Sequence, residues 1–154
     1  MSVVQIQIGQ CGNQLGAELL NTIYADSISK TSVPSADRAY AIEALSVFFD
    51  ESSESRLQAR CVQVDMEEKA LDRLSLAARS RGTWYYPANN RLTAKCGSGN
   101  NWAYGFFVHA SEIDNKLEEP IRNQLERCDL LDGLLITMSL AGGTGSGVGT
   151  QLLL

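Results

Sequence analysis

The sequence is poor in the residues that build metal and redox centres. It has one histidine, His109, and its four cysteines, Cys11, Cys61, Cys96 and Cys128, are widely spaced, with no Cys-x-x-Cys pair. Zinc sites need these ligands in clusters at short spacing, so no zinc site is expected. Four free thiols, packed mainly in the core, fit a reducing compartment. A single histidine without a carboxylate or thiol partner nearby is expected to be structural.

Long apolar runs and an excess of positive charge are also absent. No stretch of 18 apolar residues occurs, and the first residues lack the basic and apolar blocks of a secretory signal. Lys and Arg number 13 against 18 Asp and Glu, a net charge of -5 at pH 7. This balance argues against a nucleic acid or an anionic membrane as the partner of the whole surface. The 154 residues are enough for one domain with a hydrophobic core.

Glycine is plentiful, above all in segment 141–147, which reads Ala-Gly-Gly-Thr-Gly-Ser-Gly. The segment lies between a strand-like run, 133–140, and an apolar stretch that begins at Val148. Glycines reach positive φ at little cost, so successive N–H groups can converge on one phosphate, and the following helix adds its free N–H groups. Thr144 and Ser146 offer hydroxyl donors. A flexible glycine turn is the alternative, which the flanking strand and helix disfavour.

Two common nucleotide motifs are excluded for this loop. No lysine follows its glycines, so it is not a Walker A loop. A dinucleotide fingerprint through Gly143 and Gly145 would need a third glycine where Val148 stands, and it normally follows a first strand. The chain is therefore not expected to be a dinucleotide-dependent oxidoreductase.

Three further joints between predicted strands and helices carry polar residues. Strand 3–8 runs into the segment Gly-Gln-Cys-Gly-Asn-Gln at 9–14, whose amides can hydrogen-bond a ligand or merely solvate a helix start. Strand 59–65 leads into a turn with the carboxylates of Asp65 and Glu67, which suit Mg²⁺ beside a phosphate. Alternatively, Glu67 and Glu68 simply favour the N-terminus of the next helix. The loop 97–105 contains glycine and asparagine, which allow close backbone approach to an anion.

The remaining elements complete an alternating order. Helical spacing predicts a helix at 69–81 that stops at Gly82, and Ser111 is the expected N-cap of a later helix. Pro120 predicts a kink in that helix, or a helix that begins near it. Segment 26–56 is expected to be an excursion with short structure of its own, and 91–96 a third strand. The order β-α-β-α-β-α-β-α predicts a doubly wound parallel sheet, with the polar joints on one edge.

These motifs resemble those of the tubulin family. Segments 9–14, 64–67, 99–103 and 142–147 look like the N-terminal nucleotide-binding domain of tubulins, in the same order, and the resemblance covers essentially the whole chain. Segments 98–105 and 138–143 are most similar to the delta type. The resemblance implies an α/β, mainly parallel, Rossmann-like sheet in residues 1–154, which would be an N-terminal portion of a longer GTP-binding domain, incomplete at its C-terminus.

The sequence departs from the family pattern at several positions. Glu68 stands where most tubulins have proline, Ala141 replaces a glycine of the loop, and Pro120 falls in a helix that tubulins keep continuous. Residues 87–95 match poorly. None of these departures removes a nucleotide contact that the resemblance implies.

The resemblance also implies a set of ligand-binding residues. Residues that would contact GTP are Gln10, Cys11, Gln14, Gly99, Asn100, Ser139, Gly142, Gly143, Thr144, Gly145 and Ser146. Asp65 and Glu67 would hold the waters of Mg²⁺ near the terminal phosphate. No catalytic residue is expected, because tubulins complete hydrolysis with an acidic residue of the neighbouring subunit, which would lie beyond Leu154.

By the same resemblance the chain is expected to be a structural constituent of microtubule-type cytoskeleton. It would lie in the cytoplasm at a centriole, basal body or cilium, with other tubulin subunits or microtubule-associated proteins as partners. No nucleic acid partner and no membrane insertion are expected. A GTP-dependent regulator of microtubule or centriole assembly that stays outside the lattice is the alternative. The three terminal leucines leave open a fragment that no longer folds.

Overall fold

The structure, a computed structural model, describes residues 1–28, 35–51, 56–80, 84–94 and 96–154. The strands are β1 Ser2–Ile8, β2 Phe49–Glu51, β3 Leu57–Ala59, β4 Cys61–Asp65, β5 Trp84–Tyr85, β6 Arg91–Thr93 and β7 Leu131–Met138. The α-helices are α1 Gly9–Ile28, α2 Ser35–Phe48, α3 Glu68–Ser80, α4 Trp102–Tyr104, α5 Ala110–Glu126 and α6 Gly149–Leu152. One 3₁₀ turn, η1 Ala88–Asn90, and two π-helical turns, η2 Gly105–His109 and η3 Thr144–Val148, complete the elements.

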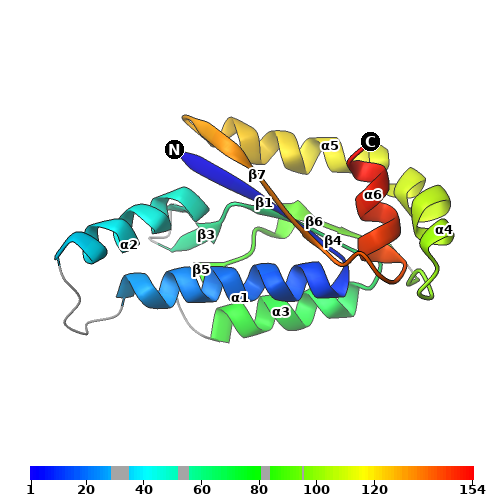
Figure 1. Ribbon diagram of the computed structural model, residues 1–154, viewed down its shortest axis with the longest axis horizontal. Helices are drawn as coiled ribbons and strands as arrows, with labels where there is room; N and C mark the ends of the chain where they lie inside the picture. The colour runs from blue at the N-terminus through cyan, green and yellow to red at the C-terminus, as the bar shows by residue number, and fades with distance from the viewer. Residues whose placement is uncertain (29–34, 52–55, 81–83, 95) are drawn as a thin grey trace.

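The centre of the molecule is a parallel sheet of four strands in the order β6-β4-β1-β7. Numbered along the chain, these strands have the order 3-2-1-4, as in doubly wound folds. Helices α1 and α3 cover one face and α5 covers the other (Figure 1). In the register, Ile8 at the end of β1 lies between Val64 of β4 and Met138 of β7. The expected α/β doubly wound sheet is therefore confirmed, and its carboxyl ends share one edge.

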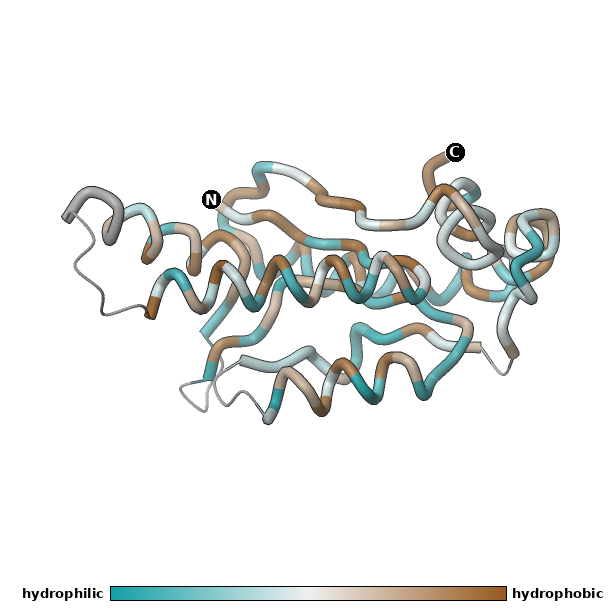
Figure 2. Tube along the Cα trace, turned by 60° about the horizontal axis from the view of Figure 1, so that its bottom comes forward, coloured by the Kyte–Doolittle hydropathy of each residue, from teal (hydrophilic) through white to brown (hydrophobic). Residues whose placement is uncertain are grey.

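The two faces of the sheet differ in polarity. Toward α5, the strands contribute Ile6, Ile8, Val62 and Val64, which pack with Ile113 and Leu117 of the helix. Toward α1, β1 and β4 present glutamines, while the apolar cluster on this side gathers around Leu20, Phe49 and Trp84. Figure 2 shows the resulting alternation of hydrophilic and hydrophobic residues along the central strands.

A second, smaller sheet has the order β2-β3-β5, with β2 antiparallel to β3 and β3 parallel to β5. The sequence predicted one strand over 59–65, but the chain passes from this sheet to the main one at Arg60. The guanidinium of Arg60 donates to the carbonyl of Phe49 at 3.2 Å and to that of Arg127 at 3.0 Å. These long-range hydrogen bonds fix the position of the chain where β3 ends and β4 begins.

Segment 26–56 contains a helix longer than expected. The 14 residues of α2 follow the end of α1, and Leu45 and Phe48 pack against the cluster around Phe49. The prediction of only short structure in this segment is wrong, because the three-residue spacing of these apolar side chains suits a helix. Predicted helix 69–81 is confirmed as α3, but its expected stop at Gly82 lies outside the described residues.

The helical run before β7 begins earlier than predicted. Asn101 caps α4, its Oδ1 accepting the N–H of Tyr104 at 3.2 Å, and helical structure continues through η2 into α5. Ser111 is therefore no N-cap, and its hydroxyl donates to the carbonyl of Phe107. Pro120 lies buried inside α5, so the expected helix start at this proline is wrong. Packing of the buried face of α5 outweighs the one backbone bond that proline removes.

Strands β6 and β7 both differ in extent from their predictions. β6 stops at Thr93, three residues before the expected end, and β7 covers Leu131–Met138 instead of 133–140. β7 forms one side of the main sheet, and no other described strand pairs with its outer edge. Leu131 and Leu134 of this strand are 41% and 48% exposed.

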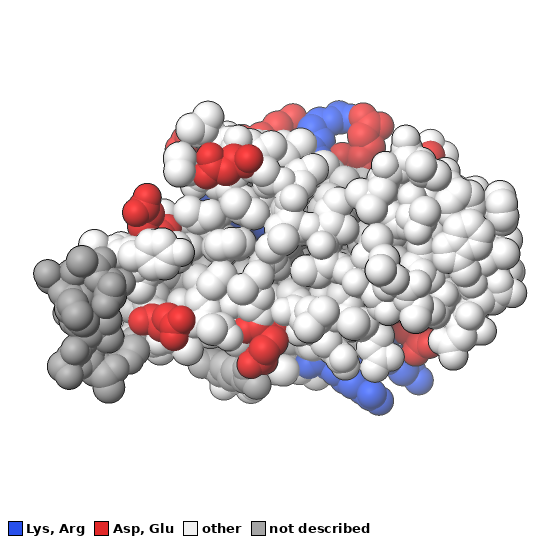
Figure 3. Space-filling view, in the orientation of Figure 1, with Lys and Arg blue, Asp and Glu red and all other residues white. Residues whose placement is uncertain are grey.

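No helix in the described ranges is long and apolar enough to cross a membrane. Charged side chains are distributed unevenly over the surface. In Figure 3 the end formed by α4 and α6 is almost free of charge on the visible face. Trp102, Tyr104 and Phe107 in this region are partly exposed.

Candidate functional site

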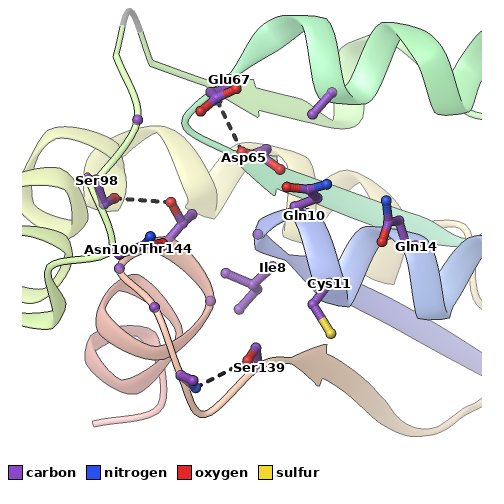
Figure 4. Close-up of a pocket in the computed structure, with 18 residues that line it drawn as sticks. Ile8, Gln10, Cys11, Gln14, Asp65, Glu67, Ser98, Asn100, Ser139 and Thr144 are labelled. Atoms are coloured by element: carbon purple, nitrogen blue, oxygen red, sulfur yellow. Dashed lines mark hydrogen bonds between the residues drawn. The ribbon is translucent and has the colours of Figure 1, made fainter.

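A cavity of about 430 Å³ lies at the carboxyl edge of the main sheet. Its walls come from the end of β1 and the start of α1, the turn after β4, the loop before α4 and the loop after β7 (Figure 4). This is where the strand order reverses, between β1 and β7, and doubly wound sheets bind ligands at that place. The volume is within the range of small-molecule sites.

The first wall is the start of α1. Gly9 has φ +71°, and a Cβ there would lie 2.7 Å from the backbone nitrogen of Gly145, so the chain turn and the glycine loop touch through backbone. Gln10, Cys11 and Gln14 are exposed and line the cavity, as expected from the sequence. The first N–H groups of the 20-residue helix α1 thus lie next to the glycine loop, where they favour binding of an anion.

The second wall is the glycine loop after β7. Gly142 has φ +90°, and the N–H of Gly147 donates to the carbonyl of Gly143 at 2.8 Å. The hydroxyl of Ser139 accepts the N–H of Ala141 at 3.1 Å, which holds the beginning of the loop. We call residues 9–11 together with 142–145 the phosphate wall.

Two hydroxyls predicted as donors in this loop differ in position. Thr144 lines the cavity, and its Oγ1 lies 3.0 Å from Oγ of Ser98 on the opposite loop (Figure 4). Ser146 is buried and does not line the cavity, because its hydroxyl turns back to the carbonyl of Gly142. Its position favours a role in closing the loop over a direct contact with a ligand.

The third wall is the acidic turn, residues 65–67. Asp65 is 4% exposed, and its Oδ1 accepts the N–H of Glu67 at 3.0 Å. Its Oδ2 is buried and has no hydrogen-bond partner. Burial raises the pKa of this carboxyl above its ordinary value; the N–H groups of Glu67 and Met66 lower it, and the charge of Glu67 raises it. An unpartnered carboxylate oxygen at a cavity wall is suited to a hard cation.

The donor set fits Mg²⁺ when a phosphate is present. Within the described ranges, no three His, Cys, Asp or Glu side chains gather closely enough to hold a metal ion alone. Mg²⁺ usually takes one or two protein carboxylates and completes its shell with water and substrate phosphates. Asp65 and Glu67 would hold it in this way, and the ion would then supply positive charge against the phosphates.

The fourth wall is the loop before α4. Gly99 and Asn100 have φ values of +57° and +55°, two consecutive left-handed residues, and both line the cavity. None of the described residues that line the cavity is a lysine or an arginine. An anion here would therefore be held by backbone N–H groups, hydroxyls and a metal ion.

The two π-helical turns interlock behind the cavity. A Cβ on Gly105 of η2 would lie 2.2 Å from the carbonyl oxygen of Gly143, and a Cβ on Gly147 of η3 would lie 2.5 Å from that of Trp102. Only glycine allows backbones this close. The loop before α4 and the phosphate wall are thus fixed to one another, and π-helical turns are frequent at functional sites.

Most predicted ligand residues line this one cavity, and Ser146 is the exception. The sequence analysis missed Ile8, Gly9, Ala70, Gly97, Ser98 and Ala141, which line it as well. Their position next to predicted residues was the available signal. His109 is buried, with Nδ1 3.3 Å from a carboxylate oxygen of Glu112, and it does not line the cavity. A structural role for His109 stays a prediction, and its premise that no carboxylate lies nearby is wrong, because Glu112 follows three residues later.

The cysteines differ from the expectation that they pack mainly in the core. All four are free, but only Cys61 is buried, whereas Cys11 and Cys96 are exposed. Burial raises the pKa of the Cys61 thiol far above its ordinary value, so this thiol stays protonated. Cys11 is the one thiol that lines the cavity.

Comparison with known proteins identifies relatives over the whole chain. Residues 2–154 match the model of the Tubulin/FtsZ family, GTPase domain. The tubulin delta chains of Canis lupus familiaris and Homo sapiens are 42% and 41% identical over 151 residues, 97% of this chain and 33% of theirs. A tubulin beta-3 chain of Oomycete-like sp. (strain MacKay2000) is 36% identical over 152 residues, 98% of this chain and 34% of its own.

The chain thus spans about a third of the length of these curated relatives. The match covers all the loops that form the cavity. It confirms the predicted resemblance to tubulins, with delta chains among the most similar relatives. The chain belongs to the Tubulin/FtsZ family, and residues 2–154 are part of its GTPase domain.

Proposed function

We propose that the chain binds GTP together with Mg²⁺ in the cavity at the carboxyl edge of the main sheet. The observation that carries this proposal is the buried, unpartnered Oδ2 of Asp65 in a cavity whose other walls are glycine loops and a helix start. Such a cavity offers N–H donors for phosphate on one side and a carboxylate for a cation on the other. Membership of a GTPase-domain family supports guanine as the base.

Each wall has a separate task in this proposal. The phosphate wall donates N–H groups to the phosphates, assisted by the hydroxyls of Thr144 and Ser139. The acidic turn holds the waters of Mg²⁺ through Asp65 and Glu67. Gln10 and Cys11 flank the phosphates and sugar, and Gln14, one turn further along α1, approaches the base. Gly99 and Asn100 close the cavity over the phosphates.

For the protein as a whole we propose a structural role in microtubule-type cytoskeleton. The tubulin delta chains and the tubulin beta-3 chain among its relatives support this assignment. Similarity to the delta type favours a place in the cytoplasm at centrioles, basal bodies or cilia, beside other tubulin subunits. We propose that hydrolysis depends on an acidic residue of a neighbouring subunit, as the resemblance to tubulins implies.

Nucleotide release tests the binding proposal. The purified protein is denatured, and the released nucleotides are identified by chromatography and counted against protein. Near one GTP or GDP per chain supports the proposal, and a folded protein that releases none, and that binds none when GTP and Mg²⁺ are added, contradicts it. Titration with ATP under the same conditions is the control for guanine selectivity. GTP binding without assembly-stimulated hydrolysis would favour the alternative, a GTP-dependent regulator outside the lattice.

Alkylation of Cys11 gives an independent prediction. In a variant carrying Cys96→Ser and Cys128→Ser, Cys11 is the only exposed thiol, since Cys61 is fully buried and its thiol has a raised pKa. GTP with Mg²⁺ is expected to slow iodoacetamide labelling of Cys11 by about tenfold or more, because the ligand covers the phosphate wall. Labelling is followed by mass spectrometry. An unchanged rate at saturating GTP would place the nucleotide elsewhere.

A further inference from the structure

A buried asparagine joins two walls of the cavity without lining the cavity itself. Asn13 lies in α1, and its side chain is fully buried. Its Nδ2 donates to the carbonyl of Gly9 at 2.9 Å and to the carbonyl of Val64 at 3.0 Å. Gly9 begins the phosphate wall, and Val64 directly precedes Asp65 of the acidic turn. One amide group thus holds both walls.

The orientation of this amide follows from its neighbours. Backbone carbonyls only accept hydrogen bonds, so only the NH₂ side of Asn13 can face Gly9 and Val64. On its other side, Oδ1 accepts from Nε2 of Gln63, 3.3 Å away. The side chain is held from both ends and has one arrangement in which its bonds are satisfied.

Gln63 belongs to a row of buried amides, Gln63, Gln7 and Gln5, that runs from β4 to β1. Its Nε2 is also 3.5 Å from Oε1 of Gln7, its partner in the register of β1 and β4. Nε2 of Gln7 donates to Oε1 of Gln5 at 2.7 Å. Gly16 of α1 leaves room for this row, since a Cβ there would lie 2.3 Å from the amide nitrogen of Gln7.

The amide row is not what burial alone would select. Buried polar groups are costly unless fully paired, yet Nε2 of Gln5 and Oε1 of Gln63 have no partner. On the opposite face, the same two strands contribute Ile6, Ile8, Val62 and Val64 to an apolar cluster. Apolar residues would stabilise this layer at least as well, so the row calls for a reason besides stability.

We propose that Asn13 is a positioning residue, which sets the distance between the phosphate wall and the acidic turn so that nucleotide and Mg²⁺ bind cooperatively. The inference rests on the proposed function. Asn13 touches neither ligand and acts through the backbone of Gly9 and Val64. The hydrogen bond to Val64 sets the distance between the two walls, because it joins α1 to β4, the strand that ends in Asp65. The bond to Gly9 lies within the helix start.

Two variants separate these bonds. Asn13→Ala removes both, whereas Asn13→Ser keeps a hydroxyl that reaches the carbonyl four residues earlier, Gly9, but is too short for Val64. Affinity of the full chain for GTP is measured with Mg²⁺ and with EDTA. We expect the ratio of the two affinities to fall by about tenfold in both variants, as for residues that orient metal ligands. Affinity in EDTA is expected to change by less than about threefold.

Gln5→Met is the matched control. It removes the far end of the amide row at similar volume, and the affinity ratio is expected to stay at its wild-type value. If the alanine variant unfolds, the serine variant carries the test, since it keeps the bond within the helix. An affinity ratio that stays at its wild-type value in both Asn13 variants, whether or not the affinities themselves fall, overturns the positioning role. Absence of GTP binding in the wild type overturns the proposed function and this inference with it.

Discussion

Replacing Gly105 with alanine is expected to destabilise the protein by about 3 kcal/mol. The new Cβ would lie 2.2 Å from the carbonyl oxygen of Gly143 and 2.9 Å from its carbon. Both are backbone atoms, so no side-chain rotation relieves the overlap, and η2 and η3 have to move apart. Urea unfolding followed by circular dichroism measures the change in free energy. GTP affinity is expected to fall as well, because the loop before α4 then leaves the phosphate wall.

Gly133→Ala is the control for this prediction. Gly133 lies in β7, has no atom within 4 Å of its Cβ position, and its φ is not in the positive range. Alanine there is expected to change the free energy of unfolding by less than about 0.5 kcal/mol, since nothing is displaced. If Gly105→Ala unfolds at the same urea concentration as Gly133→Ala, the interlock of the two turns is not a tight contact.

Replacing Asp65 with asparagine is expected to lower the affinity for Mg²⁺ in the presence of GTP by about 100-fold or more. The variant keeps the shape of the side chain and an oxygen for the N–H of Glu67, but it loses the charge of the unpartnered Oδ2. Titration of Mg²⁺ into the GTP-loaded protein measures this affinity. Glu112→Gln is a suitable control, since Glu112 is exposed and does not line the cavity. A wild-type Mg²⁺ affinity in Asp65→Asn would exclude Asp65 from the metal site.

The same variant is expected to change the dependence of stability on pH. Burial raises the pKa of Asp65 in the folded protein above the value of 3.8 that applies when the carboxyl is exposed. The folded state therefore binds the proton more tightly, and in EDTA this group costs stability as the pH rises from 3.8 through the folded pKa. Asp65→Asn removes that loss, so the difference in free energy of unfolding between variant and wild type grows with pH. A difference that stays constant from pH 4 to pH 7 would contradict this.

Elements of the fold that depend on local pattern were predictable. β1 is rich in valine and isoleucine, which alternate with glutamine in its second half, and α3 has apolar residues at helical spacing, so both follow from the sequence. The break between β3 and β4 could not be predicted from local pattern, because it depends on hydrogen bonds from Arg60 to residues 11 and 67 positions away in the chain. The start of α5 was missed for a similar reason, since Ser111 has the pattern of an N-cap but the chain is already helical through η2.

The motifs and their position after predicted strands located the walls of the cavity, but not the direction of every side chain. Gly99, Asn100 and the glycine loop were predictable, because positive φ is costly for other residues. That Ser146 faces its own loop depends on the π-helical turn of η3, which no residue pattern announces. The sequence predicts the amides of segment 9–14 only as ligand contacts or as solvation of a helix start, because the bond from Asn13 to Val64 spans 51 positions in the chain.

The outer edge of β7 has a practical consequence for handling the protein. None of the described strands pairs with this edge, and a strand edge bordered by exposed leucines is a template on which a second strand can add. At high concentration this edge is expected to drive self-association and precipitation of the 154-residue polypeptide. Light scattering at increasing concentration would detect it, and a lysine at Leu134 in the middle of the edge is the natural means to raise the solubility limit.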